Sequence, residues 1–365
     1  MNIIFVCKRY YTGKDVIRHR FGRLYEIPTQ LARLGHDILV LCLDYRNKNH
    51  QEGFTEQFGS GSVKWIIVPI RNILNFEFTA NYRTIKSMQA TLIIGSSDIP
   101  CLWLSRHLSN CLGAYYIVDL YDNYESFGQA RIPWFKRSLR ASIKAANAII
   151  VVSSTLKTKI MRDYSPTGSV LVMNNGIDAG SFSIGDRLEA RISLRLPLQG
   201  RLIGTAGNLS RMKGLDTVYD AWHELQETTE NTYLVLAGKT DPKLPLPTGE
   251  RVIYLGEILE NEIVQLFRAL DVGIVPGHDS AFGRYCFPQK LFEMIACGLP
   301  VVAAKVGAIE DALHMNPAIL FAPGDHKILA KTINLQLEYP QLPNIKPMQW
   351  NELIRDIESI IKNLI

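Results

Sequence analysis

The chain has 365 residues, a length that suits two domains of middling size better than one. Hydrophobic residues make up 47% and charged residues 21% of the sequence, which is typical of a globular protein and excludes a largely disordered one. No apolar run reaches the roughly 18–20 residues that a membrane-spanning helix needs. The net charge of +5 is compatible with an anionic ligand or membrane surface, and we expect no nucleic-acid partner.

The first residues and the cysteines bear on the cellular compartment. Residues 1–7 lack the basic start and long apolar core of a signal peptide, so we interpret them as a first strand. The six cysteines form no CxxC pair and no zinc-binding spacing, which favours reduced thiols. We therefore expect a cytoplasmic protein.

Short apolar runs alternate with helix-like segments through the first half of the chain. The runs are rich in Val and Ile and apolar at consecutive positions, which is typical of buried parallel strands. They lie at residues 3–7, 38–43, 63–69, 92–95, 115–119, 148–152 and 170–173. Helix-like segments between them include residues 21–34, ended by Gly35, and residues 134–146. This alternation predicts a doubly wound α/β sheet.

A second series of strands and helices follows residues 181–200, which we interpret as a connector. The predicted strands lie at residues 202–206, 233–236, 252–255, 272–275, 301–304 and 319–321, with helices at 215–227, 260–269, 289–297 and 328–337. We therefore predict two Rossmann-like domains, residues 1–182 and 183–347, that face each other across a ligand-binding cleft. Residues 348–365 have a helical period; they either end the second domain or, as we favour, pack back on the first.

The segment from Gly204 to Gly214 has the pattern of a phosphate-binding loop. A predicted buried strand leads into a turn with glycines, basic residues follow, and a helix begins near residue 215. Such a loop offers backbone N–H groups and a favourable helix dipole to an anion. Arg211 and Lys213 add charges suited to phosphate oxygens. The alternative is a plain strand–turn–helix connection with solvated basic side chains.

The segment from Tyr285 to Ala304 contains a second predicted cradle for a diphosphate. Pro288 suits the first turn of a helix, and the N–H groups of residues 289–291 would then point out of the helix start. Glu293 lies one turn further on, where its carboxylate could accept hydrogen bonds from both hydroxyls of a ribose. The helix dipole alone also favours a carboxylate here, but the apolar neighbours of Glu293 favour a functional partner.

Several motifs follow one another along the chain in a characteristic order. The most specific is Pro-x-Lys-Leu-Phe-Glu-Met-x-Ala-x-Gly-Leu-Pro-Val-Val-Ala, which begins at Pro288. The others are Leu31-Ala-Arg-Leu-Gly-His-Asp-Ile-Leu-Val40, Ile149-Ile-Val-Val-Ser-Ser154, Asn174-Asn-Gly-Ile-Asp178, Gly207-Asn-Leu-Ser-x-x-Lys-Gly214, Leu236-Ala-Gly238, Tyr254-Leu-Gly256 and Asp271-Val-Gly-Ile-Val-Pro276. Over nearly its whole length the chain resembles the retaining glycosyltransferases of the GT-B fold, family-4-like (glycosyl transferases group 1).

The resemblance implies donor-binding roles for residues of the second domain. Lys213 matches the family lysine that binds the donor diphosphate; the arginine expected five residues before it is Asn208 here, and Arg211 could supply the missing charge. Glu293 matches the second glutamate of the E-x7-E element, which holds the ribose, whereas the first, which contacts the sugar, is replaced by Tyr285. The other implied donor residues are Phe287, the pyrophosphate-binding loop Gln289, Lys290 and Leu291, and Ile258 along the base.

A polar cluster follows the predicted strand at residues 115–119, at the carboxyl edge of its sheet. Many relatives have His followed by Asp or Glu at this point, whereas here Tyr121 replaces the histidine and Asp122 remains. The resemblance places Asp122 nearest the reaction centre, with Tyr121, Asn123 and Glu125 around it. The alternative is that the carboxylates only cap the helix that follows.

Cations after the first predicted strand form the expected acceptor side. They are Lys8, Arg9, Lys14, Arg18, His19, Arg20 and Arg23, with Arg20, Asn123 and Glu125 as the acceptor-binding candidates. These cations either bind an anionic acceptor, such as a lipid-linked diphosphate sugar, or form a solvated basic face. The paired glycines of relatives are absent, since Gly13 and Gly22 stand apart.

Residues 131–144 carry five cations, two aromatic residues and no acidic residue. Aromatic side chains beside cations suit the headgroup region of an anionic bilayer, so a peripheral contact at the inner face of the cell membrane is one interpretation. The other is that Trp134 and Phe135 belong to the core at a helix start.

The implied reaction moves a sugar from a UDP- or GDP-linked donor to a saccharide or lipid-linked acceptor with retention. Its expected role is the synthesis of cell-surface polysaccharide, lipopolysaccharide or glycolipid. Asp122, Tyr121 and Lys213 are the catalytic candidates. We expect no cofactor besides the donor and no metal ion, because preorganised cations and a helix N-terminus would stabilise the leaving diphosphate.

Two alternatives stay open on the sequence. One is a nucleotide-sugar epimerase or hydrolase on the same fold, and the other is a binding or scaffold subunit that has lost catalysis. The replacements at Tyr121 and Tyr285 are what a scaffold would show. The retained Lys213 and Glu293, with their spacing, favour an enzyme.

Overall fold

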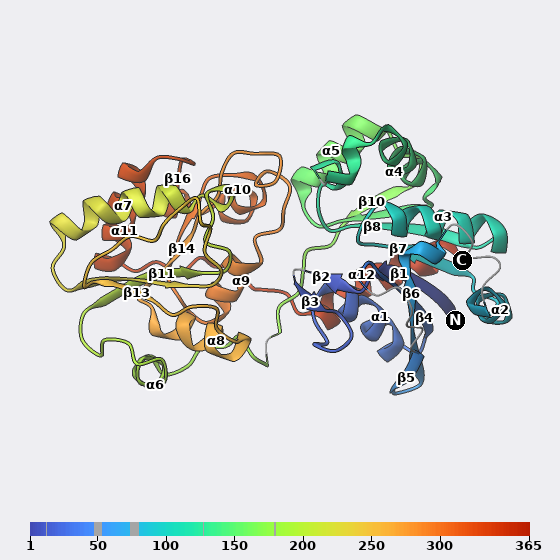
Figure 1. Ribbon diagram of the computed structural model, residues 1–365, viewed down its shortest axis with the longest axis horizontal. Helices are drawn as coiled ribbons and strands as arrows, with labels where there is room; N and C mark the ends of the chain where they lie inside the picture. The colour runs from blue at the N-terminus through green and yellow to red at the C-terminus, as the bar shows by residue number, and fades with distance from the viewer. Residues whose placement is uncertain (12, 47–52, 74–79, 127, 179) are drawn as a thin grey trace. The chain divides into compact units, whose positions relative to one another are not determined.

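The chain is built from two compact α/β units (Figure 1). The computed structural model describes residues 1–11, 13–46, 53–73, 80–126, 128–178 and 180–365. The first unit consists of Met1–Gly176 and Trp350–Ile365, and the second of Ile177–Gln349. The cleft that we predicted between the domains concerns their relative placement and stays a prediction.

The division between the units lies before the boundary that we predicted at residue 182. Ile177 forms a parallel bridge with Gln349 and donates its N–H to the carbonyl oxygen of Met348 at 3.0 Å. These contacts tie the first residue of the second unit to its last residues. The chain therefore leaves the first unit at Gly176.

The first unit contains an eight-stranded sheet in the order β10-β9-β8-β7-β1-β4-β6-β5. Its strands are β1 (Asn2–Lys8), β4 (Asp37–Asp44), β5 (Gly53–Phe58), β6 (Gly61–Pro69), β7 (Leu92–Gly95), β8 (Tyr115–Leu120), β9 (Ala148–Val151) and β10 (Ser169–Val172). Every strand that we predicted in this half occurs. Strand β5 was missed because it is an antiparallel, largely exposed and polar edge strand, without the apolar run that marks a buried strand.

Helices cover both faces of this sheet (Figure 1). They are α1 (Arg23–Arg33), α2 (Ala80–Ser87), α3 (Ile99–Leu112), α4 (Pro133–Ala145), α5 (Ser154–Tyr164) and α12 (Trp350–Leu364). The C-terminal α12 belongs to this unit, where its apolar side is buried and Oε2 of Glu358 lies 2.7 Å from Nε2 of His36, just before β4. A two-stranded hairpin, β2 (Tyr10–Tyr11) and β3 (Lys14–Asp15), follows β1.

The second unit contains a six-stranded parallel sheet in the order β13-β12-β11-β14-β15-β16. Its strands are β11 (Arg201–Ala206), β12 (Thr232–Ala237), β13 (Val252–Tyr254), β14 (Val272–Val275), β15 (Val301–Ala304) and β16 (Leu320–Phe321). The helices are α6 (Arg187–Ser193), α7 (Leu215–Thr228), α8 (Glu260–Ala269), α9 (Gln289–Ala296), α10 (Gly307–Leu313) and α11 (His326–Glu338). The predicted doubly wound α/β class is confirmed for both units.

The strand orders locate the places where each sheet can bind a ligand. In the first sheet the chain runs outward from β1 on one side and from β7 on the other, so the order reverses between them. In the second sheet the reversal lies between β11 and β14. Ligands of open α/β sheets bind beyond the carboxyl ends of the strands at such a switch point. Among the described helices, none combines the length and apolar character needed to cross a bilayer.

Candidate functional site

The glycine loop of the second unit lies at its switch point. Gly207 is the first residue beyond β11, and its φ of 120° favours glycine. Its N–H donates to the carbonyl oxygen of Ala237 at 2.9 Å, and a Cβ atom in its place would lie 3.0 Å from Nζ of Lys290. The ammonium group of Lys290 therefore lies directly against bare backbone of the loop.

A single 3-10 turn, η5 (Arg211–Lys213), joins this loop to α7. Gly214 ends the turn with a φ of 82° and donates its N–H to the carbonyl oxygen of Arg211 at 2.8 Å. A Cβ atom at Gly214 would lie 2.9 Å from the nitrogen of Gly277, just beyond β14. Glycine therefore lets the two loops of the switch point touch, and Lys213 is held at the start of α7.

Two lysines from different elements converge at this edge. Nζ of Lys213 lies 3.8 Å from the ring centroid of Phe282, a cation–π contact with the loop that precedes α9. Burial, and then repulsion from Lys213, lower the pKa of Lys290 to about 8, and attraction by Glu293 opposes this only in part. An anion bound beside both lysines would relieve the repulsion between them.

Two predicted donor residues of the same loop are more exposed. The side chain of Arg211 is 67% exposed, and its Nη1 lies 3.9 Å from Asp216, which also contacts His278 at 3.1 Å. Asn208 is exposed as well. The second positive charge near Lys213 is thus that of Lys290, rather than the charge of Arg211 that we expected from the sequence.

The start of α9 differs in detail from the predicted diphosphate cradle. Pro288 caps the helix instead of occupying its first turn. The N–H of Gln289 donates to Phe287 and that of Leu291 donates to Pro288, both at 3.0 Å. Two of the three N–H groups that we expected to face a ligand therefore have carbonyl acceptors within the chain, and the side chain of Lys290 becomes the stronger candidate contact.

The remaining donor candidates lie on the same unit. Glu293 is half-buried on α9, whose neighbouring residues Leu291 and Met294 are buried. Tyr285 is half-buried in the loop before α9. Phe287 is half-buried and stacks on Phe292 with a centroid distance of 4.8 Å, and Ile258 is half-buried beyond β13.

In the first unit, Tyr121 follows β8 and is 7% exposed. Its ring meets Tyr11 edge-on at 5.0 Å and Tyr124 at 5.5 Å, and Nζ of Lys8 lies 5.5 Å from its centroid. Burial, with smaller contributions from Tyr124 and Tyr11, raises the pKa of Tyr121 well above its ordinary value. Among the described residues its hydroxyl finds no hydrogen-bond partner, so the group is a protonated donor at the sheet edge.

The residues after Tyr121 form a tight turn. Oδ1 of Asp122 accepts the N–H of Asn123 at 2.7 Å, and Asn123 is buried. Glu125 forms an ion pair with Lys159 of α5 and accepts a hydrogen bond from Tyr164 at 2.8 Å. Although burial would raise the pKa of Glu125, these hydrogen bonds hold it below its ordinary value. Glu125 thus anchors the turn to α5, whereas Asp122 is half-buried at its start.

A fully buried ion pair between Asp119 and Arg23 lies behind this turn. Nη2 of Arg23 lies 2.7 Å from Oδ1 of Asp119, and Nε bonds both carboxylate oxygens. Ser96 donates to the same carboxylate at 2.7 Å, and Nη1 of Arg23 donates to the carbonyl oxygen of Met173 at 2.9 Å. Arg23 is therefore not part of the basic face that we considered, and Asp119 does not cap a helix.

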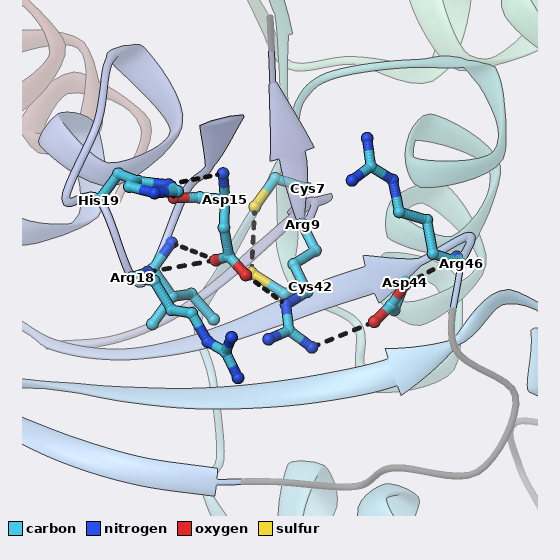
Figure 2. A network of polar contacts seen from close by, with 9 residues as sticks. Cys7, Arg9, Asp15, Arg18, His19, Cys42, Asp44 and Arg46 are labelled. Carbon is cyan, nitrogen blue, oxygen red and sulfur yellow. Dashed lines mark hydrogen bonds and ion pairs between the residues drawn. The ribbon is translucent and has the colours of Figure 1, made fainter. Parts of the chain in front are cut away.

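A second buried network holds the hairpin that follows β1 (Figure 2). Nε of Arg9 lies 2.9 Å from Asp15, and its Nη1 lies 3.1 Å from Asp44 at the end of β4. Asp15 also accepts the N–H groups of Ile17 and Arg18. Arg9 was expected among the cations on the acceptor side, but its charge is neutralised by the two buried carboxylates of Asp15 and Asp44.

The other cations of this region remain at the surface or near the switch point. Arg20 is exposed, and its Nη2 pairs with Glu56 of β5 at 3.0 Å, so this acceptor candidate faces the sheet's outer edge strand. Lys8 is half-buried beside Tyr121. The backbone N–H of Lys8 donates to Oγ of Ser97. Ser97 is a buried residue with a φ of 89° that joins the ends of β1 and β7.

Within the described part of the chain, no group of three or more His, Cys, Asp and Glu side chains is placed to hold a metal ion. Independence of a metal ion stays a prediction.

Each of the two units matches the model of a protein family. Residues 23–180 match the model for Glycosyltransferase Family 4, and residues 200–338 match the model for Glycosyl transferases group 1. A D-inositol 3-phosphate glycosyltransferase of Segniliparus rotundus is 22% identical over 304 residues, which cover 80% of this chain and 59% of that protein. One of Acidothermus cellulolyticus is 30% identical over 199 residues, 50% of this chain and 43% of that protein. The chain thus spans about three fifths or less of these relatives.

Solved structures show the same fold. Sucrose-phosphate synthase from Thermosynechococcus elongatus has a TM-score of 0.75 and 17% identity, covering 100% of this chain and 98% of that one. HepE of Anabaena in complex with UDP-glucose has a TM-score of 0.67 and 18% identity, with all of both chains covered. The chain therefore has the GT-B fold and contains a Glycosyltransferase Family 4 domain followed by a Glycosyl transferases group 1 domain.

Proposed function

We propose that this chain transfers a sugar from a nucleoside-diphosphate sugar to an acceptor hydroxyl. The observation that carries the proposal is that Lys290 lies against the bare backbone of Gly207, at the switch point of the second sheet, and is repelled there by the charge of Lys213. A diphosphate has the charge to neutralise both ammonium groups. HepE, a structural neighbour, is known in complex with UDP-glucose, which favours a UDP-linked donor over a GDP-linked one.

The proposed chemistry depends on charge that develops on the leaving diphosphate. Lys213 and Lys290 lie in place before the sugar bond breaks, so they can stabilise that charge without reorganisation and without a metal ion. Glu293 would hold the ribose, as in the family. Retention of the anomeric configuration, by attack on the face that the diphosphate leaves, is part of this proposal.

The acceptor side of the proposed reaction lies at the edge of the first sheet. The high pKa of Tyr121 keeps its hydroxyl protonated, so it can donate a hydrogen bond but cannot act as a base. Asp122 is therefore the group that we assign next to the reacting carbon, where a carboxylate favours positive charge. Asn123 and Lys8 would line the acceptor pocket.

The acceptor that we propose is a saccharide or a lipid-linked saccharide. The pathway would be the synthesis of cell-surface polysaccharide, lipopolysaccharide or glycolipid, in the cytoplasm at the inner face of the membrane. The names of the relatives, which include D-inositol 3-phosphate glycosyltransferase and sucrose-phosphate synthase, associate this fold with phosphate-bearing compounds.

A scaffold subunit without catalysis is the second candidate. It is favoured by Tyr121 and Tyr285, which replace the histidine and glutamate of the family pattern. An epimerase or hydrolase would instead consume the donor without an acceptor. The presence of Lys213 and Lys290 at the proposed donor site favours the transferase, since a scaffold has no need of a diphosphate-binding site.

The proposal is tested by calorimetry with UDP, GDP, ADP and dTDP, followed by turnover of the corresponding nucleotide sugars. We expect one diphosphate to bind at micromolar concentration and its sugar to be consumed only when an acceptor is added. Consumption without an acceptor would identify an epimerase or hydrolase. Failure of all four diphosphates to bind would refute the donor site.

A further inference from the structure

The N-terminal part of α4 exposes large apolar side chains. Trp134 is 50% exposed and Ile132, which precedes the helix, is 51% exposed. The opposite side of α4 is closed, because Leu139 and Ile143 are buried in the unit. Trp134 was expected either in the core or at a membrane; it does not lie in the core.

The outer side of α4 carries only positive charge. Arg137, Arg140 and Lys144 are exposed and recur at helical spacing, on the side opposite Leu139. The sequence has no acidic residue between Glu125 and Asp163, so no carboxylate of that stretch can neutralise them. Arg140 lies 5.2 Å from the ring centroid of Tyr164, whereas no such ring contact holds Arg137 or Lys144 among the described residues.

Helix α3 extends the surface with further aromatic side chains. It packs against α4, and Trp103 of α3 lies 6.5 Å from Trp134 between ring centroids. His107 stacks on Trp103 at 5.6 Å with the rings nearly parallel. Between Ile99 and Leu112 the sequence contains no acidic residue either.

We propose that this α3–α4 surface, formed by Trp103, His107, Ile132, Trp134, Arg137 and Lys144, docks on an anionic lipid bilayer. Tryptophan is favoured at the boundary between headgroups and acyl chains, because its ring is apolar and its N–H is polar. The exposed cations would lie among lipid phosphates, and their attraction adds to the apolar contact. A nucleic acid would use the cations but would not require the exposed Ile132.

The inference deepens the proposed function, because it names the surface that would hold the protein at the inner face of the membrane; it rests on that function for its purpose but not on the donor chemistry. All of its residues belong to the first unit, whereas Lys213 and Lys290 belong to the second. If the surface docks on a bilayer, it brings the unit that we assign to the acceptor to a lipid-linked substrate. A variant can therefore lose binding to the membrane and keep binding to UDP, or lose binding to UDP and keep binding to the membrane.

Sedimentation with lipid vesicles tests the charge of the surface. We expect the full chain to bind vesicles that contain phosphatidylglycerol and to bind phosphatidylcholine vesicles weakly. The double variant Arg137→Gln/Lys144→Gln should lose on the order of twentyfold in vesicle affinity, because each cation at an anionic surface contributes about fivefold. The matched control Arg83→Gln/Lys86→Gln removes two exposed cations from α2 and should bind like the unmodified protein.

Tryptophan fluorescence tests the apolar part of the surface. Vesicles should shift the emission to shorter wavelength, and Trp134→Ala should remove most of the shift and weaken binding at least about tenfold while the melting temperature is kept. Equal loss in the α2 control would show that binding follows net charge alone and would overturn the proposal. The surface would be assigned to nucleic acid if a single-stranded RNA competed with the vesicles for binding and vesicles caused no shift of the tryptophan emission.

Discussion

The carboxyl edges of the two sheets use positive charge in opposite ways. At the first sheet, Arg9 and Arg23 are buried and each bonds carboxylates that hold loops together. At the second sheet, Lys213 lies over an aromatic ring, and burial, followed by repulsion from Lys213, lowers the pKa of Lys290 to about 8. Cations that pair with carboxylates of the chain stabilise the loops at the sheet edge. Cations that repel each other instead favour the binding of an anion between them.

This contrast predicts its largest effect on stability for Asp119→Ala. The change leaves Arg23 fully buried without its carboxylate, which should lower the free energy of unfolding by about 3–5 kcal/mol. Urea unfolding followed by circular dichroism measures the loss. The control Arg20→Gln breaks an exposed pair with Glu56 and should cost less than about 1 kcal/mol. Similar losses in both variants would mean that the buried pair has no special structural role.

A kinetic effect of about a hundredfold is expected for Asp122→Asn, because loss of a charge beside the reacting carbon acts on the transition state. Binding of UDP should be unchanged, since the diphosphate site that we propose belongs to the other unit. Initial rates of transfer and calorimetry measure the two quantities. The control is Glu125→Gln, whose carboxylate pairs with Lys159, and this variant should lose stability more than rate. A normal rate in Asp122→Asn would remove that residue from the reaction.

The positive charges of Lys213 and Arg211, which both belong to the turn η5, can be compared directly. Lys213→Met should weaken UDP binding at least about tenfold, the effect of one lost charge-assisted hydrogen bond. Arg211→Gln removes the same charge from a side chain that is 67% exposed, and it should change the affinity less than about threefold. Calorimetry at low salt measures both. A larger loss for Arg211 would reverse our assignment of the second charge to Lys290.

The sequence predicted the sheets well because buried parallel strands leave a strong local signal. Apolar residues at consecutive positions marked β1 and its neighbours to within a few residues. Strand β5 left no such signal because its side chains are largely exposed. The glycine loop and Lys213 were also predictable, since both lie in one short segment.

The buried ion pairs were not predictable from local pattern. Arg23 and Asp119 are 96 residues apart, and Arg9 and Asp44 are 35 residues apart. A cation in a loop looks the same in sequence whether its partner is a carboxylate or water, so both arginines were counted among the cations that either bind an anionic acceptor or form a solvated basic face. For the same reason Lys290, which meets Gly207 only through the fold, was assigned a role for its backbone alone.

The smallest predicted effect is a proton linkage at Lys290, and it tests the donor edge most specifically. In the free protein the pKa of Lys290 is lowered to about 8, by burial and then by Lys213, while Glu293 raises it. A bound diphosphate favours the ammonium form, so the pKa of Lys290 rises and binding takes up a proton above pH 8. Affinity for UDP should therefore fall as pH rises through 8, by at most about tenfold per pH unit.

Calorimetry near pH 8.5 in two buffers that differ in ionisation enthalpy measures this proton directly. We expect uptake of a fraction of one proton in the unmodified protein and close to none in Lys290→Met. Lys290→Arg keeps the charge but does not titrate in this range, so it should bind UDP with the proton uptake removed. Unchanged uptake in both variants would place the titrating group elsewhere. In that case the repulsion between Lys213 and Lys290 would not explain why this edge accepts an anion.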